Sequence, residues 1–148
     1  PTTARMPAGR RAEVAALARA FDLQVIEDDC YTTFAPTLAA IRGLAPERTW
    51  FVGSISKTVS AALRFGWVLC PPGMGHTGRL TAQHSFFSLS RPVGDLCLGL
   101  LTSGMAATLH QRANAAFAER LEVVVQTLGA HDLAWQPGLH FVFLRLPS

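Results

Sequence analysis

The single lysine of this chain is the residue whose type most directly suggests chemistry. Lys57 lies in the segment 53–58, Gly-Ser-Ile-Ser-Lys-Thr, and all the other basic side chains apart from histidine are arginines. A guanidinium stays protonated, whereas a desolvated primary amine can lose its proton and attack a carbonyl carbon. Lys57 is therefore the candidate for a lysine that bonds a carbonyl compound covalently. An ordinary surface lysine is the alternative.

Polar side chains follow two expected strands at the point where each strand ends. The two strands are the apolar runs 23–27 and 49–52. In an open α/β sheet, ligands bind at the carboxyl ends of the strands, so we expect the polar side chains that follow these runs to form one site. They are Asp28, Tyr31, Ser54, Ser56, Lys57 and Arg64.

This set of side chains provides what pyridoxal 5'-phosphate requires of a protein. The aldehyde of that cofactor needs an amine, and its phosphate needs hydroxyl donors and a cation that can bind in a bidentate manner. The pyridine nitrogen needs a carboxylate that holds its proton, because a protonated ring is the better electron sink. A tyrosine can donate to the phenolic oxygen of the ring. A lysine, two serines, an arginine, an aspartate and a tyrosine meet these needs.

Three segments resemble the motifs of the class I/II, fold-type I aminotransferases. Segment 1–11, Pro-Thr-x-x-x-Met with Arg-Arg at its end, resembles the Asn-Pro-Thr-Gly-x-x-Met…Arg-Arg motif of that family. Segment 26–31 resembles Asp-x-x-Tyr, and segment 53–67 is similar to the signature Ser-x-Ser-Lys…Leu-Arg-x-Gly-Trp. Segment 137–146 resembles the opening of the small domain, so the resemblance extends through nearly the whole chain. One departure is Thr3, where the family usually has glycine.

The resemblance implies a role for each member of the set. Lys57 would form the Schiff base with pyridoxal phosphate, and Asp28 would pair with the pyridine nitrogen. Tyr31 would contact the ring oxygen. Ser54 and Arg64 would hold the phosphate.

Other interpretations of these residues stay open. Ser56 belongs to the same cofactor-binding set but could only shape the turn, and Ser54 could also be a plain turn residue. Arg64 could form a structural ion pair. The acidic run 27–29 could be a solvated strand end or a metal cluster, but Asp28 faces opposite to its neighbours on a strand. We expect no metal site, since the five histidines show no ligand spacing.

The order of elements predicts an α/β fold. The resemblance implies that it is the C-terminal half of a fold-type I aminotransferase large domain, with a mixed, mostly parallel sheet and helices, plus the start of the α+β small domain. Residues 1–104 would be part of the cofactor-binding large domain, 105–129 a long interdomain helix, and 130–148 the beginning of the small domain. Both ends read as cut, so we expect an internal piece of a longer protein. The expected helices are 10–21, 77–88, 92–101 and 106–128, and the expected strands are 23–27, 49–52, 65–70, a strand at Trp135, and 141–146.

Composition limits the function classes. Hydrophobic residues make up 49% and charged residues 16%, and the net charge is +3, so we expect no direct contact with nucleic acid. No run approaches the roughly 20 apolar residues that span a bilayer, and no membrane contact is expected. Three cysteines without a CxxC pair fit a reducing, cytoplasmic location.

Two functions follow from the resemblance. The first is a pyridoxal-phosphate-dependent aminotransferase, a homodimer acting on an amino acid and a 2-oxo acid. The alternative is the pyridoxal-phosphate-binding effector domain of a winged-helix, GntR/MocR-type transcriptional regulator, which would contact nucleic acid only through an N-terminal domain outside this chain. A degenerate, cofactor-free domain is a third interpretation.

Overall fold

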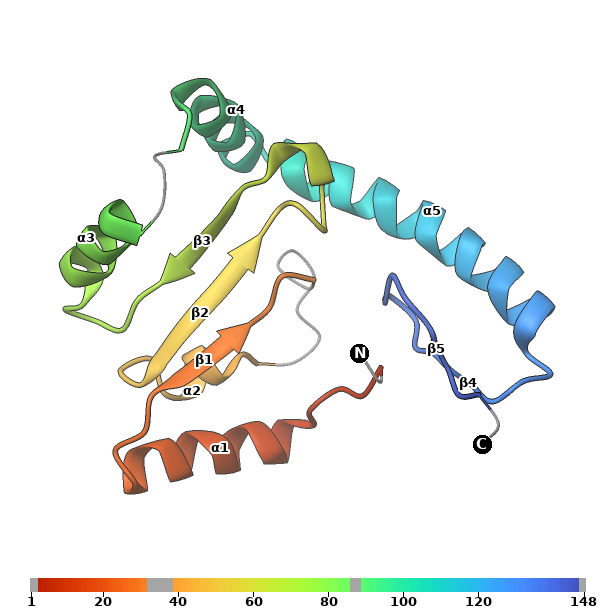
Figure 1. The fold of residues 1–148 in the computed structure, drawn as a ribbon, viewed down its shortest axis with the longest axis horizontal. Helices are drawn as coiled ribbons and strands as arrows, with labels where there is room; N and C mark the ends of the chain where they lie inside the picture. Colours follow the sequence, from red (N-terminus) through yellow and green to blue (C-terminus); the bar gives the residue numbers. More distant parts are fainter. Residues whose placement is uncertain (1–2, 32–38, 86–88, 147–148) are drawn as a thin grey trace.

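The structure, a computed structural model, describes residues 3–31, 39–85 and 89–146. It has an α/β fold built around a three-stranded sheet (Figure 1). In chain order the elements are α1 (Ala8–Ala20), β1 (Val25–Asp28), α2 (Ile41–Leu44), β2 (Thr49–Ser54), the 3-10 helix η1 (Ala61–Leu63), β3 (Gly66–Leu69), α3 (Gly75–Ser85), α4 (Arg91–Thr102), α5 (Met105–Leu128), β4 (Leu133–Ala134) and β5 (Phe143–Leu144).

The sheet places the ends of β1 and β2 at the same edge. β2 is the central strand; it pairs with β1 in parallel, with Asp28 opposite Val52, and with β3 antiparallel, with Ser54 opposite Gly66. The sheet is thus mixed, as predicted, with one parallel and one antiparallel pair among the described strands. Since a strand advances about 3.3 Å per residue, Ser54 lies roughly two residues beyond the level of Asp28.

Helix α1 contacts the rest of the fold through its alanines. The sequence predicts an amphipathic helix with the apolar residues Val14, Leu17 and Phe21. Val14 packs against the core, but Leu17 and Phe21 are exposed, and Ala15 and Ala18 are the buried residues. Ala15 belongs to a small core cluster with Ile41 and Ala45 of the α2 segment, against which Val14 and Val25 pack. Alanine has the smallest side chain that still excludes water, so it allows α1 to approach α2 closely.

Strand β1 is only half covered. The sequence predicts a buried strand, yet Ile26 is 76% exposed while its neighbour Glu27 is buried. Adjacent side chains on a strand point to opposite faces, so one face of β1 meets α1 and α2 and the other carries Ile26. Among the described residues, nothing covers the Ile26 face.

Helix α5 runs along the edge of the sheet where β1 and β2 end, and the β4–β5 hairpin lies beside it, on the side of the helix where β1 ends (Figure 1). The helix predicted at 106–128 is confirmed as Met105–Leu128, with Gly104 at its N-cap in a left-handed conformation (φ 75°). The two strands of the hairpin are shorter than predicted. Trp135 follows β4 instead of lying in it, and β5 holds only Phe143 and Leu144 of the expected run 141–146.

The remaining helices follow the sequence pattern closely. α3 begins two residues before the predicted Thr77, and the predicted end of that helix at 86–88 lies outside the described residues. α4 covers Arg91–Thr102 with a proline in its first turn, where the absent N–H costs no hydrogen bond. In the described part of the chain, no single helix has the length and apolar composition to cross a membrane; α4 and α5 meet that standard only as a pair with an 81° bend between them.

Candidate functional site

Lys57 lies on a tight turn that follows β2 and that several hydrogen bonds hold in place. The Ile55 side chain is fully buried, and its carbonyl accepts from the amides of Val59 (2.9 Å) and Ser60 (3.1 Å). The buried Thr58 hydroxyl donates to the carbonyl of Ser54 at 3.2 Å. These contacts fix the backbone on both sides of Lys57, whose own side chain is exposed. The turn therefore presents the amine outward from a rigid base.

The two serines of the turn converge on one carbonyl. Ser54 Oγ donates to Phe65 O at 2.9 Å and accepts from the Ser56 amide at 3.0 Å. Ser56 Oγ also points to Phe65 O, at 3.4 Å. Both hydroxyls thus shape the turn in this structure. A phosphate oxygen can only accept, so Ser54 would have to rotate its hydroxyl away from Phe65 O to donate to a phosphate.

Arg64 has an unusual backbone conformation and an exposed guanidinium group. It caps η1 in the left-handed region (φ 47°, ψ 38°), which favours glycine and costs a non-glycine residue of order 1 kcal/mol. Its guanidinium is exposed and makes no hydrogen bond or ion pair with the described residues. The alternative of a structural ion pair thus has no support within the described part of the chain. The unusual backbone lies directly beside Phe65, on whose carbonyl the two serines converge.

The charges of Asp28 and Lys57 both influence the thiol of Cys30. Cys30 N donates to Asp28 Oδ1 at 3.2 Å. Burial raises the pKa of the Cys30 thiol to about 11, with help from the hydrogen bond and negative charge of Asp28 and the charge of Asp29, while the nearby Lys57 charge lowers it. The aspartates and the lysine therefore lie within electrostatic reach of one thiol.

Tyr31 belongs to an aromatic cluster with the segment that joins β4 to β5. Its ring packs edge-on against His140 (centroids 6.3 Å apart) and Phe141 (5.7 Å). His140 in turn stacks on Phe117 of α5 at 4.0 Å. The ring of Tyr31 is thus packed against residues that lie more than a hundred positions away in the sequence.

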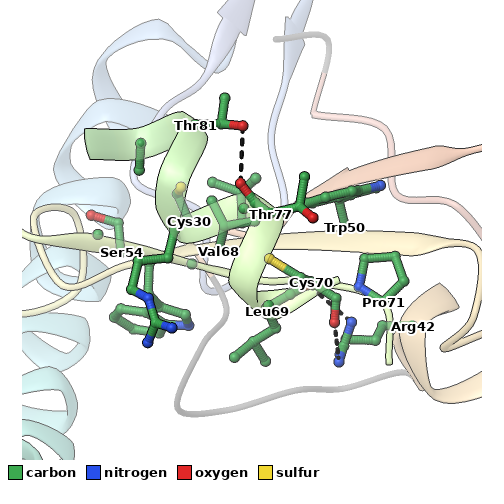
Figure 2. Close-up of a pocket in the computed structure, with 18 of the residues that line it drawn as sticks. Cys30, Arg42, Trp50, Ser54, Val68, Leu69, Cys70, Pro71, Thr77 and Thr81 are labelled. Atoms are coloured by element: carbon green, nitrogen blue, oxygen red, sulfur yellow. Dashed lines mark hydrogen bonds between the residues drawn. The ribbon is translucent and has the colours of Figure 1, made fainter. Parts of the chain in front are cut away.

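A cavity of about 1070 Å³ adjoins this site between the sheet and α3 (Figure 2). Cys30 and Ser54 line one end of it, and Arg42, Trp50 and Cys70 line another part. Arg42 donates to the carbonyls of Leu69 and Cys70, which closes the cavity at the end of β3. Of the six predicted site residues, only Ser54 lines this cavity, so it is a neighbour of the site and not the site itself.

The described geometry fits pyridoxal phosphate at this edge of the sheet. Near the carboxyl ends of β1 and β2, the Lys57 amine and the Arg64 guanidinium are exposed and make no hydrogen bond or ion pair within the described residues. Asp28 uses one carboxylate oxygen to accept from Cys30 N, which leaves the other available. The donor set thus offers an amine, a phosphate-binding cation and a carboxylate.

Several residues that organise the site carry no signal in the sequence. Glu27 is no solvated strand end: its carboxylate accepts from Arg11 Nη1 (3.0 Å) and from the amides of Ile41 and Arg42 (both 2.9 Å). It therefore points away from Asp28, as strand alternation requires. In the described part of the chain, no three His, Cys, Asp or Glu side chains gather in a way that could hold a metal ion.

His110, Asn114 and His140 also escaped the sequence analysis, in which the histidines had no recognisable spacing. His110 is buried and its Nδ1 lies 3.2 Å from the carbonyl of Thr58, next to Lys57. Asn114 bridges His110 and His140 at 3.0 Å on each side. The spacing of four between His110 and Asn114 places them on one face of α5, but nothing in the sequence identifies Thr58 or His140 as their partners.

No protein-family model matches the chain. Two curated relatives are similar to it in sequence. The HTH-type pyridoxine biosynthesis transcriptional regulator PdxR of Corynebacterium glutamicum is 29% identical over 97% of the chain. The HTH-type transcriptional regulator TauR of Rhodobacter capsulatus is 32% identical over 90% of it. The chain spans about a third of the length of these relatives, 33% of the first and 28% of the second.

Solved structures of aminotransferases share the fold. A kynurenine aminotransferase of Pyrococcus horikoshii, solved in complex with PMP, matches 93% of the chain with a TM-score of 0.78 and 19% identity. An aspartate aminotransferase mutant of Thermus thermophilus matches 93% of it with a TM-score of 0.80 and 23% identity. The chain covers 36% and 37% of these two proteins. It therefore has part of the fold of the pyridoxal-phosphate-dependent aminotransferases, as the sequence motifs predict.

Proposed function

We propose that this chain is the lysine-bearing part of a pyridoxal-phosphate-binding domain, and that the domain serves as the effector-binding part of a transcriptional regulator. The observation that carries the first half is the exposed amine of the single lysine, held on a rigid turn within electrostatic reach of the same thiol as Asp28. The second half is supported by the two regulators that match 97% and 90% of the chain.

Each polar group has a defined task in this proposal. Lys57 Nζ would bond the aldehyde carbon of the cofactor, whose oxygen would leave as water, and Asp28 would hold the proton of the ring nitrogen. Tyr31, steadied by its aromatic neighbours, donates to the ring oxygen. Arg64 binds the phosphate, with Ser54 as a second donor once its hydroxyl turns from Phe65 O. When bound, the cofactor supplies an electron sink that a protein side chain cannot provide.

The rest of the turn has a supporting role. Ser56 keeps its hydroxyl on Phe65 O and preserves the shape of the turn. The carbonyl of Phe65 thereby remains satisfied even if Ser54 turns to the phosphate. We also propose, from the resemblance in sequence, that the full-length protein is a cytoplasmic homodimer.

An aminotransferase is the second candidate, and its support is the likeness to aminotransferase structures over 93% of the chain. In that case an amino acid and a 2-oxo acid are the substrates. The Lys57 amine, released by the substrate amine, then moves the proton of the substrate α-carbon. The same side chains serve both functions, so the fold alone does not choose between them.

A titration of the full-length protein with pyridoxal phosphate tests the shared part of the proposal. The wild-type protein should develop the visible absorbance of a lysine-bound cofactor, and Lys57→Arg should not, because arginine keeps its charge and cannot bond the aldehyde. Arg79→Gln is the control: among the described residues, the side chain of this exposed arginine of α3 has one hydrogen-bond partner, His76, and the variant should behave as wild type. Equal absorbance in Lys57→Arg and wild type would overturn the proposal.

Two further assays of the same protein separate the candidates. A regulator should bind its operator DNA with an affinity that changes when pyridoxal phosphate is added, and this change should vanish in Lys57→Arg. An aminotransferase should convert a 2-oxo acid to an amino acid at the expense of a donor amino acid. Turnover without any cofactor-dependent DNA binding would favour the enzyme.

A further inference from the structure

Three hydrogen bonds join the segment between β4 and β5 to the turn of Lys57. His140 Nε2 lies 3.0 Å from Asn114 Oδ1, and Asn114 Nδ2 lies 3.0 Å from His110 Nε2. His110 Nδ1 lies 3.2 Å from Thr58 O. The row begins in the segment that follows Pro137 and Gly138 and ends at the residue beside Lys57.

One assignment of protons satisfies every hydrogen bond in this row. A carbonyl oxygen can only accept, so His110 carries its proton on Nδ1 and donates to Thr58 O. In the neutral ring Nε2 is then an acceptor, which requires Asn114 to present its NH₂ group. Asn114 Oδ1 therefore faces His140, which must donate through Nε2–H. All three donors point toward the turn, and bonds aligned in this way polarise and strengthen one another.

The far end of the row contacts another residue of the proposed site. The His140 ring packs edge-on against Tyr31 and stacks on Phe117. Burial lowers the pKa of His140, with the nearby His110 adding to the effect. A ring with its proton on Nε2 is the tautomer that the row needs. Tyr31 and the Lys57 turn are thus tied to each other through α5, although they lie on different strand ends.

We infer that a relay of three residues positions the Lys57 turn and Tyr31 with respect to each other. The relay consists of His110, Asn114 and His140. Movement of the segment 137–142 therefore changes how Lys57 holds its ligand. The three relay residues are positioning residues that act through Thr58 and Tyr31. The inference rests on the proposed function for what Lys57 binds, but the hydrogen bonds themselves do not depend on it.

The test uses the full-length protein and the substitution Asn114→Leu, which keeps the size of the side chain and removes both hydrogen bonds. The control is Gln126→Leu, the same change of an amide to an alkyl group on α5, where the amide contacts only Glu122 at 3.4 Å. The first readout is amide hydrogen exchange of the cofactor-free protein, read on peptides that cover 55–60 and 137–142. The second is the dissociation constant of pyridoxal phosphate.

Asn114→Leu should raise exchange about tenfold at the amides of Val59 and Ser60, which the turn protects, and should also raise it in 137–142. It should weaken cofactor binding about threefold to tenfold, the effect of one or two neutral hydrogen bonds. Gln126→Leu should leave both segments and the dissociation constant unchanged. If the two variants exchange alike at Val59 and Ser60, the inference is wrong.

Rescue by a conservative substitution separates positioning from general stability. In Asn114→Asp the side chain keeps its shape, and its carboxylate can accept from an N–H group of each neighbouring histidine, so the row of hydrogen bonds survives. This variant should keep wild-type exchange in 55–60 and wild-type cofactor affinity near pH 7. Exchange in Asn114→Asp as fast as in Asn114→Leu would contradict the inference.

A variant that does not fold, or a protein that bonds no cofactor, still leaves the inference testable. If Asn114→Leu does not fold, His140→Leu decides. It removes the distant donor together with the ring that packs on Tyr31 and Phe117, and it should still raise exchange at Val59 and Ser60; no change there would overturn the relay. If the wild-type protein bonds no cofactor at Lys57, the proposed function fails, yet the exchange measurements still support or refute the relay.

Discussion

The carboxylate of Glu27 lies 3.0 Å from Nη1 of Arg11, and this ion pair joins β1 to α1 beneath the proposed site. The same carboxylate accepts from the first two amides of α2, so one buried acid connects three elements. The next residue along the strand is Asp28, which faces the other way. The position of Asp28 therefore depends on what holds Glu27.

Glu27→Gln should destabilise the protein because the NH₂ group that replaces Oε2 cannot accept from the Arg42 amide, and because the side chain loses the charge that pairs with Arg11. We expect the free energy of unfolding to fall by about 1–3 kcal/mol, the cost of a buried donor left without its charged partner. Urea unfolding of the full-length protein measures it. Glu13→Gln, which removes an exposed ion pair with Arg10, is the control and should cost less than about 0.5 kcal/mol. Equal losses in the two variants would show that Glu27 does not hold these elements together.

Gly53, just before the Lys57 turn, should not tolerate a side chain. A Cβ at this position would lie 2.5 Å from Cε2 of Trp67, which pairs with Gly53 across β2 and β3. Gly53→Ala should lower the free energy of unfolding by about 1–3 kcal/mol through overpacking. Gly99→Ala in α4 meets no atom within 4 Å and should raise that free energy by about 0.5–1 kcal/mol. Thermal unfolding of both variants checks the contrast, and a stable Gly53→Ala would be inconsistent with the Trp67 contact.

Local sequence patterns predicted the helices and strands well, but they did not predict which residues far apart in the sequence contact each other. The helix at 106–128 and the strand that begins at Thr49 follow from runs of residues with a clear period or a clear turn at the end. The strand end that places Asp28 near the Lys57 turn follows from the rule that parallel strands end at one edge.

The buried faces could not be predicted in the same way. The sequence favoured an amphipathic α1 with Leu17 and Phe21 among its apolar residues, yet both are exposed and the alanines are buried, because the partner of a helix decides which of its faces is covered. The hydrogen bond from His110 to Thr58 spans 52 residues, and the bond from His140 to Asn114 spans 26. No spacing rule connects such positions without the fold.

The reactivity of Cys30 should report on Asp28. Its raised pKa, about 11, means that less of the thiol is ionised at a given pH than at the ordinary value of 9.0, so alkylation should be slow. Asp28→Asn removes a charge that raises this pKa and should therefore speed alkylation of Cys30 at about pH 9. Mass spectrometry of the Cys30 peptide measures the rate, with the Cys97 peptide as an internal reference. An unchanged rate would place Asp28 too far from the thiol to act on it.

Asp28 should also govern the electronic state of the cofactor. A carboxylate next to the ring nitrogen favours its protonated form, so Asp28→Ala should lower the pKa of that nitrogen by about 1–3 units while the cofactor stays bound to Lys57. The pH dependence of the cofactor absorbance in the full-length protein measures this shift. Asp29→Ala is the comparison and should leave the pKa in place. A larger shift in Asp29→Ala than in Asp28→Ala would mean that the other carboxylate holds the ring.

The most direct test of the account is to find where the cofactor is attached. The full-length protein is incubated with pyridoxal phosphate, reduced with borohydride so that the bond to the amine becomes permanent, digested, and mapped by mass spectrometry. The account predicts the added pyridoxyl-phosphate mass on Lys57, in the peptide that contains Ser54 and Ser56, and its loss in Lys57→Arg. A labelled lysine elsewhere in the protein, with Lys57 unmodified, would contradict it.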